Sequence, residues 1–202
     1  MSVEAFFTDD GKQRITECVS AIEADTRAEI VVAVRPRVPG LEAYDFWVAA
    51  AVAYAGLLGL LYLPMPFSLW IFALGVPALF VSARMLMQIS AALRRLVVPA
   101  ARRRACAIEA ARATFHSLNV RETRERNGVL MFVCPAERTV VVLRDRGLQR
   151  VLTDEDITTA EACLEGEASL DRLLAALAEL GTRLAGEHPR GDKTDNELEE
   201  VA

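Results

Sequence analysis

The chain has 202 residues and a formal net charge of −5 at pH 7, a total that does not by itself indicate a charged partner. Its four cysteines form no CxxC pair and it has only two histidines, which excludes a zinc ribbon, a redox dithiol and a histidine-rich metal site. The arginines between residues 84 and 104 are not interleaved with aromatic residues as in single-strand binders, so we expect no nucleic-acid partner.

The N-terminal part predicts one helix followed by one strand. Apolar residues recur at helical spacing over residues 9–25, after the polar start at Thr8. Residues 29–35 are β-branched and apolar on both faces, which predicts a strand in the interior of a sheet. The first 30 residues have no short apolar run behind a basic start, so we expect no cleaved signal peptide.

Residues 46–83 contain no Asp, Glu, Lys or Arg and are interrupted by a turn at residues 63–66. As helices at ~1.5 Å per residue, the two legs would each be about 25 Å long, close to a hydrocarbon core of ~30 Å. The pattern therefore predicts a two-helix transmembrane hairpin, kinked at Pro77 in its second leg. The alternative is a buried hairpin inside a soluble core, which is disfavoured because soluble helices usually carry a polar stripe.

Arginines flank this segment on both sides, whereas the turn between its legs carries no basic residue. By the positive-inside tendency, both termini are expected in the cytoplasm, with two passes through the cell inner membrane. Residues 85–98 are expected to form an interfacial helix, with Arg94 and Arg95 available to lipid phosphates. Ala51, Ala55 and Gly59, with Gly56 beside them, offer a small-residue face for close helix contact, and a homo-oligomer is an expected possibility.

The rest of the chain predicts alternating helices and strands. Helices are expected at residues 100–118 and 170–186, where apolar residues recur at spacings of three and four. Residues 129–134 and 139–144 are expected to pair as antiparallel strands around a turn at 135–138. Residues 153–156 predict an acid-rich helix start; a divalent-cation loop is the weaker alternative, because the spacing lacks the glycine of a calcium loop.

These elements divide the chain into four segments. Residues 1–43 and 91–190 form the two parts of one α/β domain, residues 44–90 form the transmembrane hairpin, and residues 191–202 form an acidic tail. The lipid bilayer is therefore one expected partner, and a membrane protein is another.

Four segments occur in an order that resembles the TPM domain family: residues 23–32, 127–133, 139–147 and 196–198. This family includes thylakoid-lumen proteins of photosystem repair and many bacterial membrane-linked proteins. The resemblance implies an α/β fold in which helices flank a small mixed β-sheet, interrupted here by the hairpin. It also implies phosphatase activity and calcium binding at acidic loop residues. Glu199 stands where the family usually has a proline.

Phosphatase chemistry needs a nucleophile or a metal-held water, together with positive charge for the phosphoryl oxygens. The candidate catalytic residues are Asp145, Arg126 and Arg146. The candidate ligands for Ca²⁺ or Mg²⁺ are Thr26, Glu29 and Asp145, and Asn127 and Gly128 would supply turn amides. The competing interpretation is that these residues only end a helix, begin a strand or shape a turn.

Two functions follow from these patterns. The first is a membrane-anchored TPM-like domain that binds or scaffolds another membrane component. The alternative is a metal-assisted phosphatase that acts on phosphate monoesters. The sequence does not decide whether the protein is an enzyme.

Overall fold

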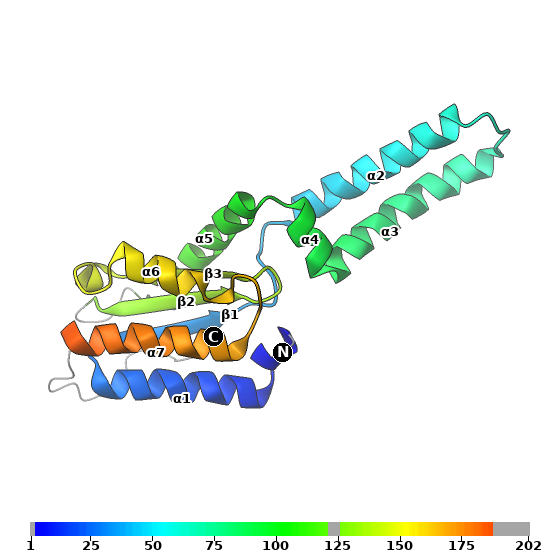
Figure 1. Cartoon of the computed structure of the whole chain (residues 1–202). Coiled ribbons are helices and arrows are strands. Elements are labelled where there is room, and N and C mark those ends of the chain that lie inside the picture. Colours follow the sequence, from blue (N-terminus) through cyan, green and yellow to red (C-terminus); the bar gives the residue numbers. More distant parts are fainter. Residues whose placement is uncertain (1–2, 121–125, 188–202) are drawn as a thin grey trace. The chain divides into compact units, whose positions relative to one another are not determined.

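The computed structural model describes residues 3–120 and 126–187 (Figure 1). The acidic tail and the 196–198 motif lie outside the described residues. The chain divides into two compact units. We call the one made of Met1–Val38 and Arg104–Ala202 the α/β unit, and the one made of Pro39–Arg103 the helical unit.

The α/β unit is built on a three-stranded mixed sheet with the order β1-β2-β3. Strand β1 (Glu29–Val34) runs parallel to β2 (Gly128–Cys134), and β2 pairs antiparallel with β3 (Thr139–Arg144). The predicted hairpin of residues 129–144 is confirmed, because its register joins Val129 to Arg144 and Cys134 to Thr139. The expectation of an α/β fold with a small mixed sheet is therefore confirmed.

Helices cover both faces of this sheet, which explains why its strands are apolar on both sides. Helices α1 (Asp9–Asp25) and α7 (Leu170–Glu187) lie side by side on one face, and α5 (Ala100–Ser117) lies on the other (Figure 1). Alternate strand residues such as Val32, Met131 and Val142 join the core beneath α1 and α7. Helices α1 and α7 approach so closely that a Cβ at Gly181 would lie 2.6 Å from Ile22 Cγ1.

Strand β1 lies at the end of the described sheet, so the prediction that it is an interior strand is wrong. Its apolar residues are buried by helices rather than by strands on both sides. The backbone N–H of Ile30 donates to the buried Glu23 carboxylate at 2.9 Å, which blunts this edge. At the other edge, helix α6 (Asp154–Glu161) lies beside β3.

The helical unit consists of two long helical segments and one short helix. Helix α2 (Glu42–Tyr62) packs against α3 (Val76–Ile89), which is preceded by a π-helical turn at Ile71–Gly75. Pro77 therefore stands in the first turn of α3, where its missing N–H is tolerated, directly after a widened turn. The Phe46 and Phe80 rings meet edge to face at 5.4 Å between centroids.

One expectation for the helical unit is corrected. Residues 85–98 do not form one helix, because Ser90 adopts an extended conformation and its side chain accepts from Leu93 N, starting α4 (Ala91–Val97).

The small-residue face of α2 is only partly used within the unit. Ala51, Ala55 and Gly59 are exposed. Gly56 beside them lies in the contact with α3, since a Cβ at Gly56 would stand 2.4 Å from Leu79 Cδ2.

Candidate functional site

One end of the sheet gathers the residues that the sequence singled out. The register places Glu29, at the start of β1, beside Gly128, at the start of β2. Strand β3 runs the opposite way and ends at this same end, where Asp145 follows it. Residues separated by more than a hundred positions along the chain are therefore brought together.

Backbone hydrogen bonds hold these loops in place. Asp145 N donates to Gly128 O at 2.9 Å, and Gly147 N donates to Arg126 O at 3.0 Å. Glu29 N donates to Asn127 O at 3.2 Å, and the Asn127 side-chain amide donates to the carbonyl of Arg27. The expectation that the Asn127 and Asp145 loops lie on a common edge of the sheet is therefore confirmed.

The oxygen-bearing residues at this end are almost fully buried. Thr26 is 0% exposed, Glu29 is 1% exposed and Asp145 is 6% exposed. Asp145 Oδ1 accepts from Arg146 N at 2.7 Å, but within residues 3–120 and 126–187 neither Asp145 Oδ2 nor Thr26 Oγ1 has a hydrogen-bond partner. A buried oxygen without a partner is costly, and a hard cation or an ordered water would satisfy it.

The two candidate phosphate clamps differ from these oxygens in accessibility. Arg126 and Arg146 are both exposed, and Arg126 has a left-handed backbone with φ 51°. Thr26 and Glu29 are too deeply buried to contact an exposed phosphate ester. The exposed arginines and the buried oxygens are therefore not equally accessible to a phosphate ester.

Gly128 has a structural role in this site that its turn-like sequence context did not reveal. It lies in β2, where a Cβ would stand 2.4 Å from the carbonyl oxygen of Val120. The chain at Val120 thus approaches the strand as closely as a bare backbone permits.

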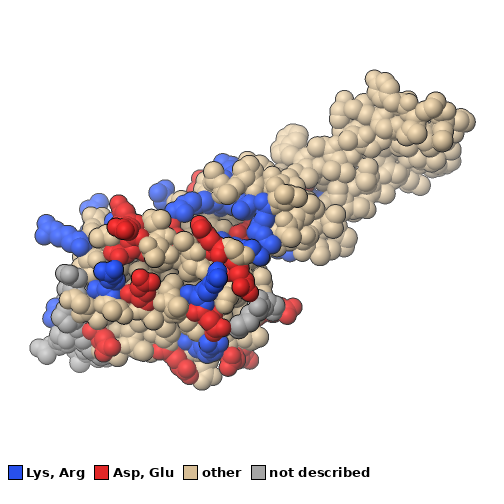
Figure 2. All heavy atoms as spheres, in the orientation of Figure 1, with Lys and Arg blue, Asp and Glu red and all other residues tan. Residues whose placement is uncertain are grey.

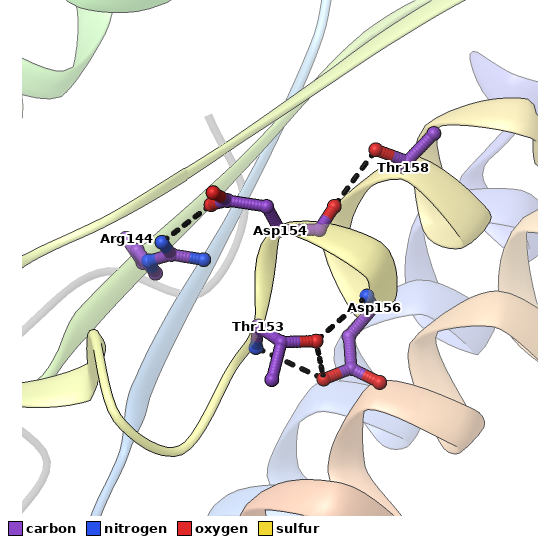
Figure 3. Close-up of polar contacts among 5 residues, drawn as sticks. All are labelled: Arg144, Thr153, Asp154, Asp156 and Thr158. Carbon is purple, nitrogen blue, oxygen red and sulfur yellow. Dashed lines mark hydrogen bonds and ion pairs between the residues drawn. The ribbon is translucent and has the colours of Figure 1, made fainter.

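The Thr153–Asp156 cluster is a helix N-terminus, as its sequence favoured (Figure 3). Asp156 N donates to Thr153 Oγ1 at 3.2 Å, and Thr153 N donates to Asp156 Oδ2 at 2.9 Å, which forms a capping box. Hydrogen bonds from Thr153 lower the pKa of the Asp156 carboxyl. Asp154 pairs instead with Arg144 at 2.6 Å, so the two carboxylates serve separate partners.

No group of three or more His, Cys, Asp or Glu side chains in the described part of the chain is placed to hold a metal ion. A cation at the sheet end would therefore rely on few carboxylates, supplemented by hydroxyl and carbonyl oxygens. A separate polar cavity of about 320 Å³ lies between α6 and α7, lined by Glu155, Glu179 and Arg183 among others.

The sequence missed several buried acids that bind backbone N–H groups. Glu161 Oε1 accepts from Val142 N at 3.0 Å, and Glu137 Oε2 accepts from Val38 N at 3.1 Å. Each acid meets a partner distant in sequence, so no local spacing indicates it.

The helical unit contains two segments long and apolar enough to cross a membrane, Glu42–Tyr62 and Ile71–Ile89. Only 17% and 6% of their apolar windows are buried within the structure, so most of their apolar residues are exposed in the described part of the chain. The pair of helices formed by α2 and α3 is almost free of charged side chains away from α4 (Figure 2).

No protein-family model matches this chain, and no curated protein is significantly similar to it. A solved structure with a similar fold is the NMR structure of the BA42 protein from the psychrophilic bacterium Bizionia argentinensis, with a TM-score of 0.56 and 16% sequence identity. The match covers 100% of this chain and 99% of that chain. At this identity the similarity concerns the fold alone.

Proposed function

We propose that this protein is a two-pass membrane protein whose α/β unit is a TPM-like binding or scaffolding module at the cytoplasmic face of the inner membrane. The observation that carries the proposal is the exposed apolar surface of α2 and α3. Leu61 on α2 is 62% exposed and Ile89 on α3 is 69% exposed, and they are two of many large apolar side chains on these helices. Burying such a side chain gains about 1.5–3 kcal/mol each, which lipid would provide.

The length of the two segments supports the same conclusion. Helix α2 has 21 residues and the segment Ile71–Ile89 has 19. At ~1.5 Å per residue both are about 30 Å long, which matches the hydrocarbon core of a bilayer. Arginines lie at the α4 end of the unit rather than at the Met65 turn, which favours a cytoplasmic location for that end.

A binding or scaffolding role is supported by the burial of Thr26, Glu29 and Asp145, because an exposed substrate would not reach their oxygens. Crosslinking in native membranes followed by affinity purification should yield a reproducible partner. Recovery of the protein alone, under conditions that retain known complexes, would count against this role.

A second candidate, the metal-assisted phosphatase, is favoured by one observation: Glu29, Asn127, Gly128 and Asp145 meet at one end of the sheet. Ca²⁺ or Mg²⁺ at Asp145 and Thr26 would satisfy their unpartnered oxygens and, together with Arg126, would attract a phosphate monoester.

Calorimetric titration of the full chain with each cation tests the metal site, and Asp145→Asn should weaken binding at least tenfold. Asp156→Asn is the matched control, because that carboxylate belongs to a capping box. Hydrolysis of p-nitrophenyl phosphate with and without the cation tests the chemistry separately. A rate that Asp145→Asn leaves unchanged would remove that residue from any active site.

A further inference from the structure

The arginines that follow α3 are not equivalent in the structure. Arg94 is buried and forms an ion pair with Asp45, in the first turn of α2. Arg103 Nη1 donates to the carbonyl oxygens of Arg95 and Val98, both at 2.7 Å. Arg94 is therefore not available to lipid phosphates as the sequence suggested, because it is buried in the ion pair that joins α4 to α2.

These contacts fix α4 in one position. Ser90 caps its N-terminus, Arg94 ties its middle to α2, and Arg103 satisfies carbonyl groups at its C-terminal end. A helix of seven residues is not stable on its own in water. The three contacts, at the start, middle and end of the helix, stabilise α4 although it is short.

The side of α4 left exposed combines apolar and basic groups. Leu96 is 84% exposed, and Val97 next to it is also exposed. Arg102 is exposed and stands over the Tyr44 ring, with its guanidinium carbon 5.7 Å from the ring centroid. No Asp or Glu occurs between residues 84 and 108, so nothing acidic in this segment opposes the positive charge.

We propose that α4 and the neighbouring Arg102 form a binding surface for anionic phospholipid headgroups. We call the set Leu96, Val97 and Arg102 the α4 surface. Leu96 and Val97 insert between acyl chains, while Arg102 contacts the phosphates. This inference rests on the proposed membrane insertion, since α4 belongs to the same unit as α2 and α3 and contacts α3.

Lipid is the occupant that the observations favour over an acidic protein. Exposed leucine and valine near Arg102, which stands over an aromatic ring, match the composition of a membrane interface. One arginine close to an anionic surface strengthens binding by about fivefold.

The first test uses native mass spectrometry of the full chain in neutral detergent, titrated with phosphatidylglycerol or phosphatidylcholine. The unsubstituted protein should retain phosphatidylglycerol preferentially, and Arg102→Gln should lower that preference by about fivefold. The matched control is Arg172→Gln on α7, which should retain it. Equal retention of the two lipids by the unsubstituted protein, or equal losses in both variants, would overturn the proposal.

The second test places an environment-sensitive dye at Leu96→Cys in the full chain in nanodiscs that contain phosphatidylglycerol. Its emission should be shifted to the blue relative to the same dye at Glu155→Cys, which is exposed on α6. Labelling of the unsubstituted chain gives the background from native cysteines. Water-like emission at Leu96 overturns the inference while leaving membrane insertion intact, whereas recovery of the chain in a carbonate-washed supernatant overturns the insertion itself.

Discussion

Glu161→Ala should open strand β3 at the edge of the sheet. The Glu161 carboxylate is buried on α6, where one oxygen accepts from Val142 N at 3.0 Å and the other pairs with Arg104. The Glu161 side chain therefore makes two contacts, one with the backbone of an edge strand and one with an arginine. Separate variants distinguish the two contacts.

The structure sets different magnitudes for the two contacts. Truncation to alanine leaves the buried Val142 N–H without an acceptor, which costs about 1–3 kcal/mol, and loses the ion pair as well. The Arg104 side chain is 54% exposed, so the pair contributes only about 0–1 kcal/mol. We expect a loss of about 1–4 kcal/mol for Glu161→Ala, about 1 kcal/mol for Glu161→Gln, and less than about 1 kcal/mol for Arg104→Gln.

Hydrogen exchange of the full chain in detergent, read by mass spectrometry on β3 peptides, measures this directly. Tryptophan fluorescence is unsuitable, because Trp47 and Trp70 both belong to the helical unit. A loss of 2 kcal/mol corresponds to about 30-fold faster exchange at Val142 if the strand opens locally. The reasoning is refuted if Arg104→Gln accelerates exchange as much as Glu161→Ala, or if Val142 stays protected in Glu161→Ala.

Three further predictions concern the α/β unit. Gly128→Ala should destabilise it by about 1–3 kcal/mol, seen as a lower thermal midpoint, because the new methyl group would meet the Val120 carbonyl; an unchanged midpoint would contradict the close approach. Asp156 has a lowered pKa in the folded state, so its contribution is present above its unfolded pKa of about 3.9 and is lost as pH falls through the folded value. Thr153→Ala should cost about 1 kcal/mol at pH 7 and less in acid, measured by urea unfolding, and an equal cost at both pH values would argue against this linkage. Burial raises the pKa of the Cys163 thiol to about 11, so its alkylation, mapped by mass spectrometry, should be slow at pH 8 and rise steeply above pH 10; rapid labelling at pH 8 would show that the thiol is not shielded.

Local sequence patterns predicted most of the secondary structure. Helix α1 begins and ends at the predicted residues, since a polar cap and a regular apolar stripe define it without help from the rest of the chain. The hairpin of β2 and β3 was likewise visible, because two apolar runs flank a short turn. Residue spacing was sufficient to predict elements that depend on contacts between residues close together in the sequence.

Contacts between distant segments could not be predicted in the same way. Strand β1 lies at the edge of the described sheet, where Glu23 accepts from its backbone and helices from elsewhere in the chain cover it. Without knowledge of these contacts, its apolar composition suggested an interior strand. The burial of Arg94 requires Asp45, 49 positions away, and an arginine-rich segment looks solvated without that partner. The helix break at Ser90 was missed for the same reason, since the α4 that follows it pairs with the distant α2 through Arg94 and Asp45.

The sequence predicted which residues belong to the candidate site, but not how exposed they are. Order along the chain correctly suggested that the Asn127 and Asp145 loops share one end of the sheet. It did not show that Thr26 and Glu29 are buried, since burial depends on how the helices cover the sheet. Burial decides whether an exposed substrate could reach these oxygens.

The most direct test of the central claim is the labelling of Met65→Cys in intact cells. The reagent is a maleimide that reaches the periplasm but does not cross the inner membrane, and the unsubstituted chain gives the background. If α2 and α3 cross the inner membrane, the turn at Met65 is labelled before lysis, while Glu155→Cys on the α/β unit is labelled only after lysis. Labelling of both positions only after lysis would contradict the account.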